Sequence, residues 1–165
     1  MRKIQFCKGY KYQLRETAVF QTRIYPDQDI KTELVELRRD GTLVIHKYFA
    51  WDGCSGPTVD DFSNYAACLG HDALYYLIRI GLLPKMWRLQ IDKELTHWMK
   101  EDGEKIAKTD AEDNRFWNFI FPLRRALLFF RANCYGWMCK VFAAWCVTTK
   151  NSRKIITAPL RGQSK

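Results

Sequence analysis

A histidine and an aspartate stand side by side in residues 66–75, AACLGHDALY, and a tyrosine follows one helical turn after the histidine. Residues four apart share one face of a helix, so His71 and Tyr75 would point the same way. Asp72 would point about 100° away, so it needs a different partner. An imidazole can take a proton from water, and a carboxylate can hold a cation. The segment therefore predicts a site for hydrolysis.

The expected partner of His71 is Asp92, which lies beyond the turn formed by Gly81 and Pro84. If the two helices run antiparallel, Asp92 faces His71, fixes its tautomer and stabilises its protonated form. Tyr75 could donate a hydrogen bond to the same carboxylate. We therefore predict His71, Asp92 and Tyr75 as the catalytic group. The alternative is structural: Asp92 is one of several solvated charges, and Tyr75 is a core aromatic residue whose hydroxyl reaches the solvent.

Asp72 has a different expected partner, the loop 51–62 that precedes the helix. Calcium takes roughly six to eight oxygen ligands from carboxylates, backbone carbonyls and water. Asp52, Asp60 and Asp61 are further oxygen donors in or beside the loop. We predict a Ca²⁺ site that is formed by the Asp72 carboxylate and by the backbone carbonyls of Gly53, Cys54 and Gly56.

This layout resembles phospholipase A2, most closely the parvovirus capsid type. The matching residues are Gly56-Pro57, Ala66-Ala67, His71 to Tyr75, Gly81 and Asp92, and the resemblance covers residues 50–100. It implies a calcium-dependent ester hydrolase that acts on phospholipid. The loop DGCSGP departs from the secreted enzymes, because it has fewer glycines than their calcium loop.

A longer stretch, residues 30–145, resembles an uncharacterised protein family of tailed bacteriophages. The shared features are an Asp-Gly-x-Ser-x-Pro loop, here within Trp51–Pro57, and a His-Asp-x-Leu-Tyr motif, here His71–Tyr75. A helix that ends in Glu101–Gly103 and an apolar helix at Leu123–Trp137 continue the similarity. This resemblance implies a viral protein and supplies no established activity.

The fold expected from the pattern is α+β, with a small antiparallel β layer followed by three or four helices. Residues 33–49 predict a hairpin with Asp40-Gly41 as its two-residue turn. Ser63 is the expected N-cap of the helix 64–80, and a second helix is expected at 85–102, ended by Gly103. The capping-box pattern at 109–112 would open a third helix, and Pro122 would break it before an apolar helix that continues to Val147.

The expected organisation is one domain at 1–150, with β structure at 1–50, the loop at 51–62 and helices at 63–149, followed by a basic tail at 151–165. The 165 residues are 47% apolar and 15% aromatic, which excludes a disordered chain. The formal charge of +9 indicates an anionic partner, and no nucleic-acid-binding motif is visible. The predicted partners are a phospholipid surface or other phage virion proteins.

The start of the chain lacks the apolar core of a signal peptide, which predicts synthesis in the host cytoplasm, with virion association as a further expectation. The six cysteines are therefore expected to be reduced. Residues 126–147 are apolar but are interrupted by Arg131, Asn133 and Lys140. Charges near the middle of a membrane span are costly, so a core helix or a helix at a membrane surface is expected there.

Two functions remain open at this point. In the first, the chain is a phospholipase A2-like enzyme. In the second, it is a phage structural or accessory protein, and the same residues form a closed polar network. A metal-dependent phosphohydrolase is a weaker third interpretation, because His46 falls in an expected strand rather than on a helix. His46 and His97 are both expected to be structural.

Overall fold

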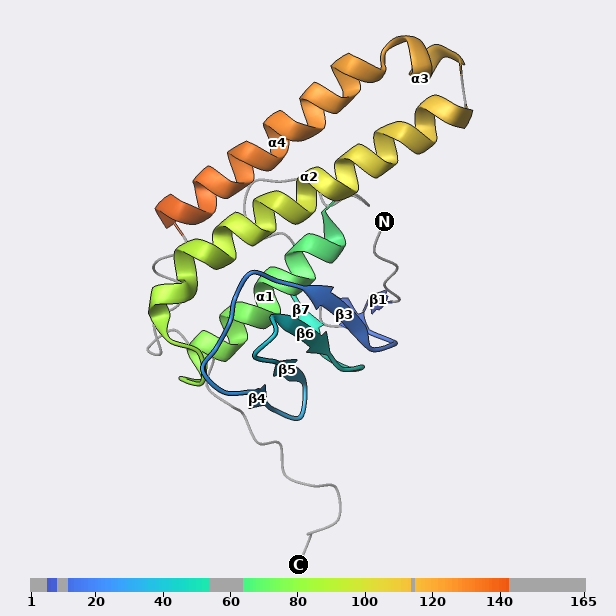
Figure 1. Ribbon diagram of the computed structural model, residues 1–165. Coiled ribbons are helices and arrows are strands. Elements are labelled where there is room, and N and C mark those ends of the chain that lie inside the picture. Colours follow the sequence, from blue (N-terminus) through green and yellow to red (C-terminus); the bar gives the residue numbers. More distant parts are fainter. Residues whose placement is uncertain (1–5, 9–11, 54–63, 114, 143–165) are drawn as a thin grey trace, which may run out of the picture.

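The computed structural model describes residues 6–8, 12–53, 64–113 and 115–142 (Figure 1). Antiparallel strands occupy the N-terminal part and helices follow them, so the predicted α+β class is confirmed. The helix that carries His71 runs antiparallel to the helix that carries Asp92. Gly70 of the first faces Trp98 of the second, whereas Tyr75, further along the first, contacts Asp92, which lies earlier in the second.

The strands form two antiparallel sheets. The sheet with the order β1-β2-β7 contains Phe6–Lys8, Tyr12–Leu14 and Ala50–Trp51. The sheet with the order β3-β6-β5-β4 contains Ala18–Gln21, Thr42–Ile45, Val35–Leu37 and Ile30–Lys31. Phe20 pairs with Leu43, and Leu37 pairs with Leu43 from the other side. All three side chains are buried, so this row of the second sheet faces the core.

The predicted hairpin at 33–49 is present as β5 and β6, but its turn is longer than two residues. The amide of Gly41 donates to the carbonyl of Arg38, and the amide of Arg38 donates to the carbonyl of Thr42. Gly41 has a φ of 81°, the left-handed conformation that closes a three-residue hairpin loop after a type I turn. The prediction of Asp40-Gly41 as a two-residue turn was therefore wrong in length and right in the role of glycine.

The described helical elements are α1 (Tyr65–Arg79), the short 3₁₀ turn η1 (Lys85–Trp87), α2 (Arg88–Asp113), α3 (Arg115–Phe119) and α4 (Phe121–Phe142). The N-cap of α1 is Asn64, and the predicted cap Ser63 lies outside the described residues. Gly81, with a φ of 79°, ends α1 as predicted, because the amides of Gly81 and Leu82 bond back to carbonyls of the last turn.

The second helix is longer than predicted, because α2 passes through Gly103 without ending. Gly103 is buried, and a Cβ atom placed there would lie 3.2 Å from the side chain of Leu128 in α4. The glycine therefore permits close helix packing rather than ending the helix. Thr109, the expected start of a third helix, lies inside α2 and donates its hydroxyl to the carbonyl of Lys105. Pro122 does mark a break, since it lies in the first turn of α4.

The core lies between the second sheet, α1 and α2. Phe20 of β3 packs against Trp98 of α2 with the ring centroids 5.3 Å apart, and Leu69 and Leu77 of α1 are fully buried in the same cluster. Helix α2 lies between α1 and α4, and α4 runs back along the outer side of α2 (Figure 1). Every helix within the described residues is too short or too polar to cross a membrane.

Candidate active site

The side chains of His71 and Tyr75 lie one above the other on the face of α1 that meets α2. Their rings are stacked with centroids 4.2 Å apart. Close packing of α1 on α2 brings them there, because Gly70 leaves room for the Trp98 ring, which would lie only 2.7 Å from a Cβ at that position. Both residues are buried, with 8% of His71 and 4% of Tyr75 exposed. The expectation that the two share one face of a helix is confirmed.

Asp92 completes this group from the first turns of α2. Its Oδ1 atom lies 3.1 Å from His71 Nε2 and accepts a hydrogen bond of 2.7 Å from the Tyr75 hydroxyl. Asp92 is fully buried, and its Oδ2 atom has no hydrogen-bond partner among the residues that the structure describes. The Arg88 guanidinium, one turn earlier, lies 3.6 Å from Oδ2. One buried carboxylate oxygen therefore holds both His71 and Tyr75, as the antiparallel arrangement predicted.

The electrostatic environment favours a charged imidazole. Burial by itself lowers the pKa of His71, but the neighbouring Asp72 and Asp92 carboxylates and the Cys139 sulfur outweigh it and raise the pKa well above its ordinary value. Burial and the hydrogen bond with Asp92 raise the pKa of Tyr75, so its hydroxyl stays protonated and remains a donor. With a proton on Nε2 directed at Asp92, the neutral imidazole has its lone pair on Nδ1.

Asp72 lies on the other side of the imidazole. Its Oδ1 atom is 3.6 Å from His71 Nδ1, and 25% of its side chain is exposed. Gly53, a predicted calcium ligand, is buried and has a φ of 77°, which turns the chain at the start of the loop. The predicted ligands Cys54 and Gly56 lie outside the described residues. The structure thus places Asp72 beside His71 Nδ1 and leaves the rest of the predicted calcium site as a prediction.

Cys139 is a member of the site that the sequence analysis missed. Within the described residues, one group of donors could hold a metal ion, namely His71, Asp92 and Cys139, whose ligand atoms lie within 4.8 Å of one another. A nitrogen, an oxygen and a sulfur donor suit zinc, whereas calcium takes oxygen ligands. This set therefore does not form the predicted calcium site, whose carboxylate is Asp72. No local signal marks Cys139, because α4 brings it there only by packing on α2.

The other two histidines have separate partners. His46 Nε2 lies 3.2 Å from a Glu36 oxygen at the end of β6. His97 Nε2 lies 2.7 Å from an Arg23 nitrogen and 3.3 Å from a Glu101 oxygen. Neither belongs to the group around His71 that could hold a metal. Their contacts join other parts of the fold.

Cys68, three residues before His71, corrects the expectation of reduced thiols. It is disulfide-bonded to a partner outside the described side chains, whereas Cys134 and Cys139 are free. Cys68 is 4% exposed and lies in the buried face of α1. The cross-link therefore ties the first part of the helix that carries the site to another part of the chain.

Comparison with known proteins adds no relative to this description. No family model, no curated protein and no solved structure matches the chain. The function must therefore be argued from the geometry of the site.

Proposed function

We propose that this chain is a bacteriophage protein with a phospholipase A2-like site, which hydrolyses an ester bond of a phospholipid. The observation that carries the proposal is the sharing of one buried Asp92 oxygen by His71 Nε2 and the Tyr75 hydroxyl. This arrangement holds the imidazole in one orientation and one tautomer. We further propose that the protein is made in the host cytoplasm and becomes associated with the virion.

In the proposed reaction, His71 acts as the general base through Nδ1. Water attacks the ester carbonyl carbon while one of its protons passes to Nδ1. Asp92 stabilises the imidazolium that forms, and Tyr75 keeps the carboxylate in place. When the tetrahedral intermediate collapses, the C–O bond to the leaving alcohol breaks. The alkoxide then takes the proton back from His71, which restores the neutral base.

Asp72 is the residue that would hold the proposed Ca²⁺, with help from the loop that begins at Gly53. Its carboxylate is partly exposed, and its 3.6 Å separation from Nδ1 is longer than an ordinary hydrogen bond, so its oxygens remain accessible to a hard cation. When bound, calcium would supply a positive charge that polarises the ester carbonyl. A cation beside Nδ1 would also favour the neutral form of His71, which the general-base step needs.

A second function is favoured by the burial of the same group. Asp92 is fully buried and His71 is 8% exposed, as expected if the group only joins α1 to α2. In that case the chain is a non-catalytic structural or accessory protein of the phage particle. The Oδ2 atom of Asp92 argues against it, because this atom accepts no hydrogen bond from the described residues and has only the Arg88 guanidinium, 3.6 Å away, as a partner. A purely structural polar network should satisfy all of its members.

The deciding experiment measures fatty-acid release from mixed phospholipid vesicles, with and without Ca²⁺. Wild type is compared with His71→Gln and Asp72→Asn, and His46→Gln is the matched control because it removes an imidazole outside this site. Calorimetric titration of Ca²⁺ accompanies each variant. The proposal expects calcium-dependent hydrolysis that both site variants lose and the control keeps. No hydrolysis and no calcium binding, with the site variants merely less stable, would leave the structural function.

A further inference from the structure

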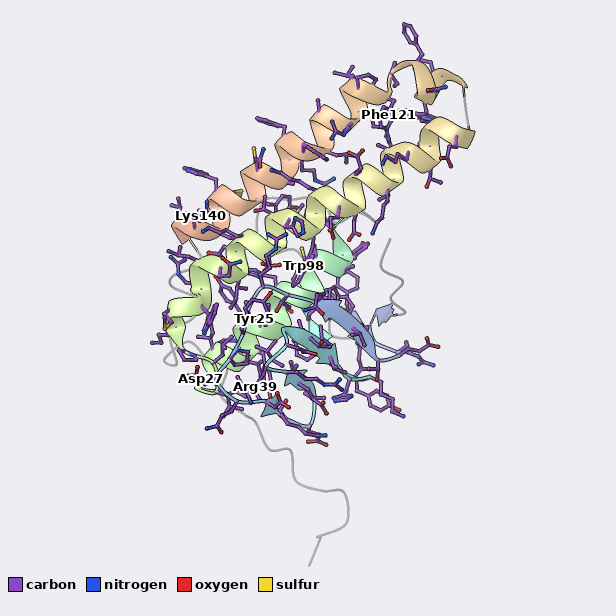
Figure 2. All side chains as sticks on the ribbon, in the orientation of Figure 1. Tyr25, Asp27, Arg39, Trp98, Phe121 and Lys140 are labelled. Atoms are coloured by element: carbon purple, nitrogen blue, oxygen red, sulfur yellow. The ribbon has the colours of Figure 1, made fainter. Side chains whose placement is uncertain are left out.

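Helix α4 exposes a continuous stripe of apolar side chains. Its members recur at alternating intervals of four and three residues and are all exposed: Leu123, Leu127, Phe130, Cys134, Trp137 and Val141. At 100° per residue they lie within about 40° of one line along the helix. The buried residues Ala132 and Tyr135 lie on the other side, which packs on α2. We call this set of six residues the α4 stripe. Figure 2 shows side chains projecting outward from α4 between Phe121 and Lys140.

Cations border the α4 stripe, and acidic residues are absent from this part of the sequence. Residues 114–165 contain none of the 18 Asp and Glu residues and ten of the 27 Lys and Arg residues. The net positive charge of the chain therefore comes from the part that contains α4. Arg131 and Lys140 lie about 80° to 100° from the stripe, on opposite sides of it. Arg124 and Arg125 are ion-paired with Asp110 and Glu104.

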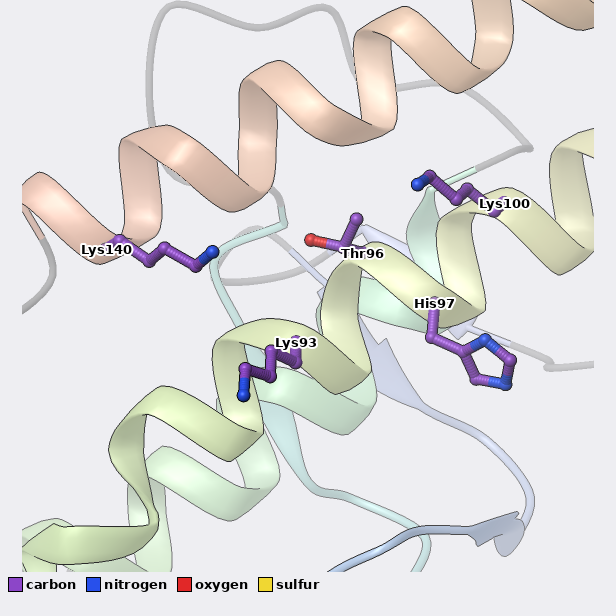
Figure 3. Close-up of a pocket in the computed structure, with 5 residues that line it drawn as sticks. All are labelled: Lys93, Thr96, His97, Lys100 and Lys140. Carbon is purple, nitrogen blue, oxygen red and sulfur yellow. The ribbon is translucent and has the colours of Figure 1, made fainter.

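A basic pocket lies beside the α4 stripe, between α4 and α2. Its volume is about 220 Å³, and it is lined by Lys93, Thr96, His97, Lys100 and Lys140. Figure 3 shows Lys140 reaching from α4 and Lys100 reaching from α2 toward the space beside Thr96, while the ring of His97 turns away. Two ammonium groups and a hydroxyl at the edge of an apolar stripe suit a phosphate group with attached acyl chains.

We propose that the α4 stripe and the basic pocket together bind an anionic phospholipid surface. A helix with Leu, Phe and Trp on one side and Lys and Arg along its flanks lies in the plane of a membrane interface, with the cations at the headgroup level. The inference rests on the proposed function in one respect: the lipid surface that α4 binds would also present the phospholipid substrate to the site. The binding itself rests on the exposed face of α4 and on the basic pocket beside it.

A second copy of the chain fits this face less well. The four-three spacing would suit a helical seam, in which the positions beside the seam pair with opposite charges. In α4 those flanking positions include Arg131 and Lys140, and the helix has no acidic residue. Two such faces would bring like charges together. An anionic lipid surface complements both the apolar side chains and the cations.

The test is cosedimentation of the full chain with vesicles of phosphatidylcholine, alone or mixed with phosphatidylserine. We expect binding to the mixed vesicles only, weakening as NaCl is raised. The double variant Leu127→Gln/Phe130→Gln should bind at least tenfold more weakly. Lys100→Gln/Lys140→Gln should lose about fivefold per lysine. The matched controls are Val19→Gln, which removes an exposed apolar side chain of β3, and Lys47→Gln, which removes an exposed cation; both should bind as wild type does.

Three results would overturn the inference. Wild type could fail to bind the mixed vesicles, or the control variants could lose as much binding as the stripe variants. Light scattering could instead show a dimer in solution that the Leu127/Phe130 variant converts to a monomer, while vesicle binding stays unchanged. The His71→Gln variant separates this proposal from the proposed function. If His71→Gln binds vesicles as wild type does, the proposal of lipid binding is supported even when neither the wild type nor the variant hydrolyses the lipid.

Discussion

Replacement of Asp92 by asparagine separates the charge of this residue from its shape. Both hydrogen bonds, from Tyr75 and from His71 Nε2, are accepted by the single atom Oδ1. An asparagine whose carbonyl oxygen takes the place of Oδ1 can accept both. Its amide group then replaces Oδ2, which accepts no hydrogen bond from the described residues but lies 3.6 Å from the Arg88 guanidinium. The variant should therefore keep the orientation and tautomer of His71 and lose the negative charge, together with the ion pair to Arg88.

The expected magnitudes follow from this geometry. Each charge-assisted hydrogen bond becomes a neutral one that is about 1 kcal/mol weaker, so the free energy of unfolding should fall by about 2 kcal/mol at neutral pH. Asp92→Ala leaves the Tyr75 hydroxyl and the imidazole N–H without an acceptor in a buried place, which should cost about 4 kcal/mol. For hydrolysis we expect kcat to fall about tenfold in the Asn variant and about 1000-fold in the Ala variant.

The assays are urea unfolding, vesicle hydrolysis and ¹⁵N NMR of the histidine ring nitrogens. The NMR spectrum of neutral His71 should show the proton on Nε2 in both wild type and the Asn variant. An Asn variant that is as unstable and as inactive as the Ala variant, or whose imidazole proton moves to Nδ1, would contradict this prediction. The unfolding and NMR measurements keep the geometric prediction testable even if no hydrolysis is found.

Three further predictions test other parts of the structure. Gly70→Ala should lower the free energy of unfolding in urea by about 1–3 kcal/mol, because the added Cβ would meet the buried ring of Trp98. An unchanged free energy of unfolding would contradict the close packing of α1 on α2. Cys139→Ser should keep calcium-dependent hydrolysis within about threefold of the wild-type rate, because loss of a general base would slow the reaction far more. Loss of activity in this variant, or zinc binding by the wild type that the variant lacks, would instead make Cys139 a metal ligand or a nucleophile. The free energy of unfolding, measured in EDTA, should fall as the pH rises above neutral. The folded-state pKa of His71 is raised, so the stabilising positive charge of the imidazole is lost as the pH passes through that value. This decline should disappear in His71→Gln.

The sequence was sufficient to predict the pairing at the centre of the site. The spacing of His71 and Tyr75 placed them on one face of a helix, and a short turn at Gly81 and Pro84 implied an antiparallel neighbour with Asp92 facing back. Both inferences depend on local periodicity and on a short connection, which leave a chain few alternatives. The structure confirms the resulting contacts at 3.1 Å and 2.7 Å.

Local sequence signals gave wrong predictions where a segment distant in the sequence packs against the residues concerned. Gly103 has the form of a helix stop, but packing against Leu128 of α4 keeps it inside α2. Gly136 likewise allows α4 to approach Thr96 closely. Residues on α2 therefore could not be interpreted without knowing that α4 returns along the same helix. The disulfide of Cys68 is a further bond that the composition did not reveal.

The sequence by itself determined the α+β class, the face shared by His71 and Tyr75, and the concentration of positive charge after Asp113. These properties follow from composition and from patterns a few residues long. Only the tertiary structure decided that Asp92 is fully buried, that Cys139 joins the site, and that the apolar stripe of α4 faces outward. Burial and long-range contacts depend on which helix packs against which, and that choice is made by the whole chain at once.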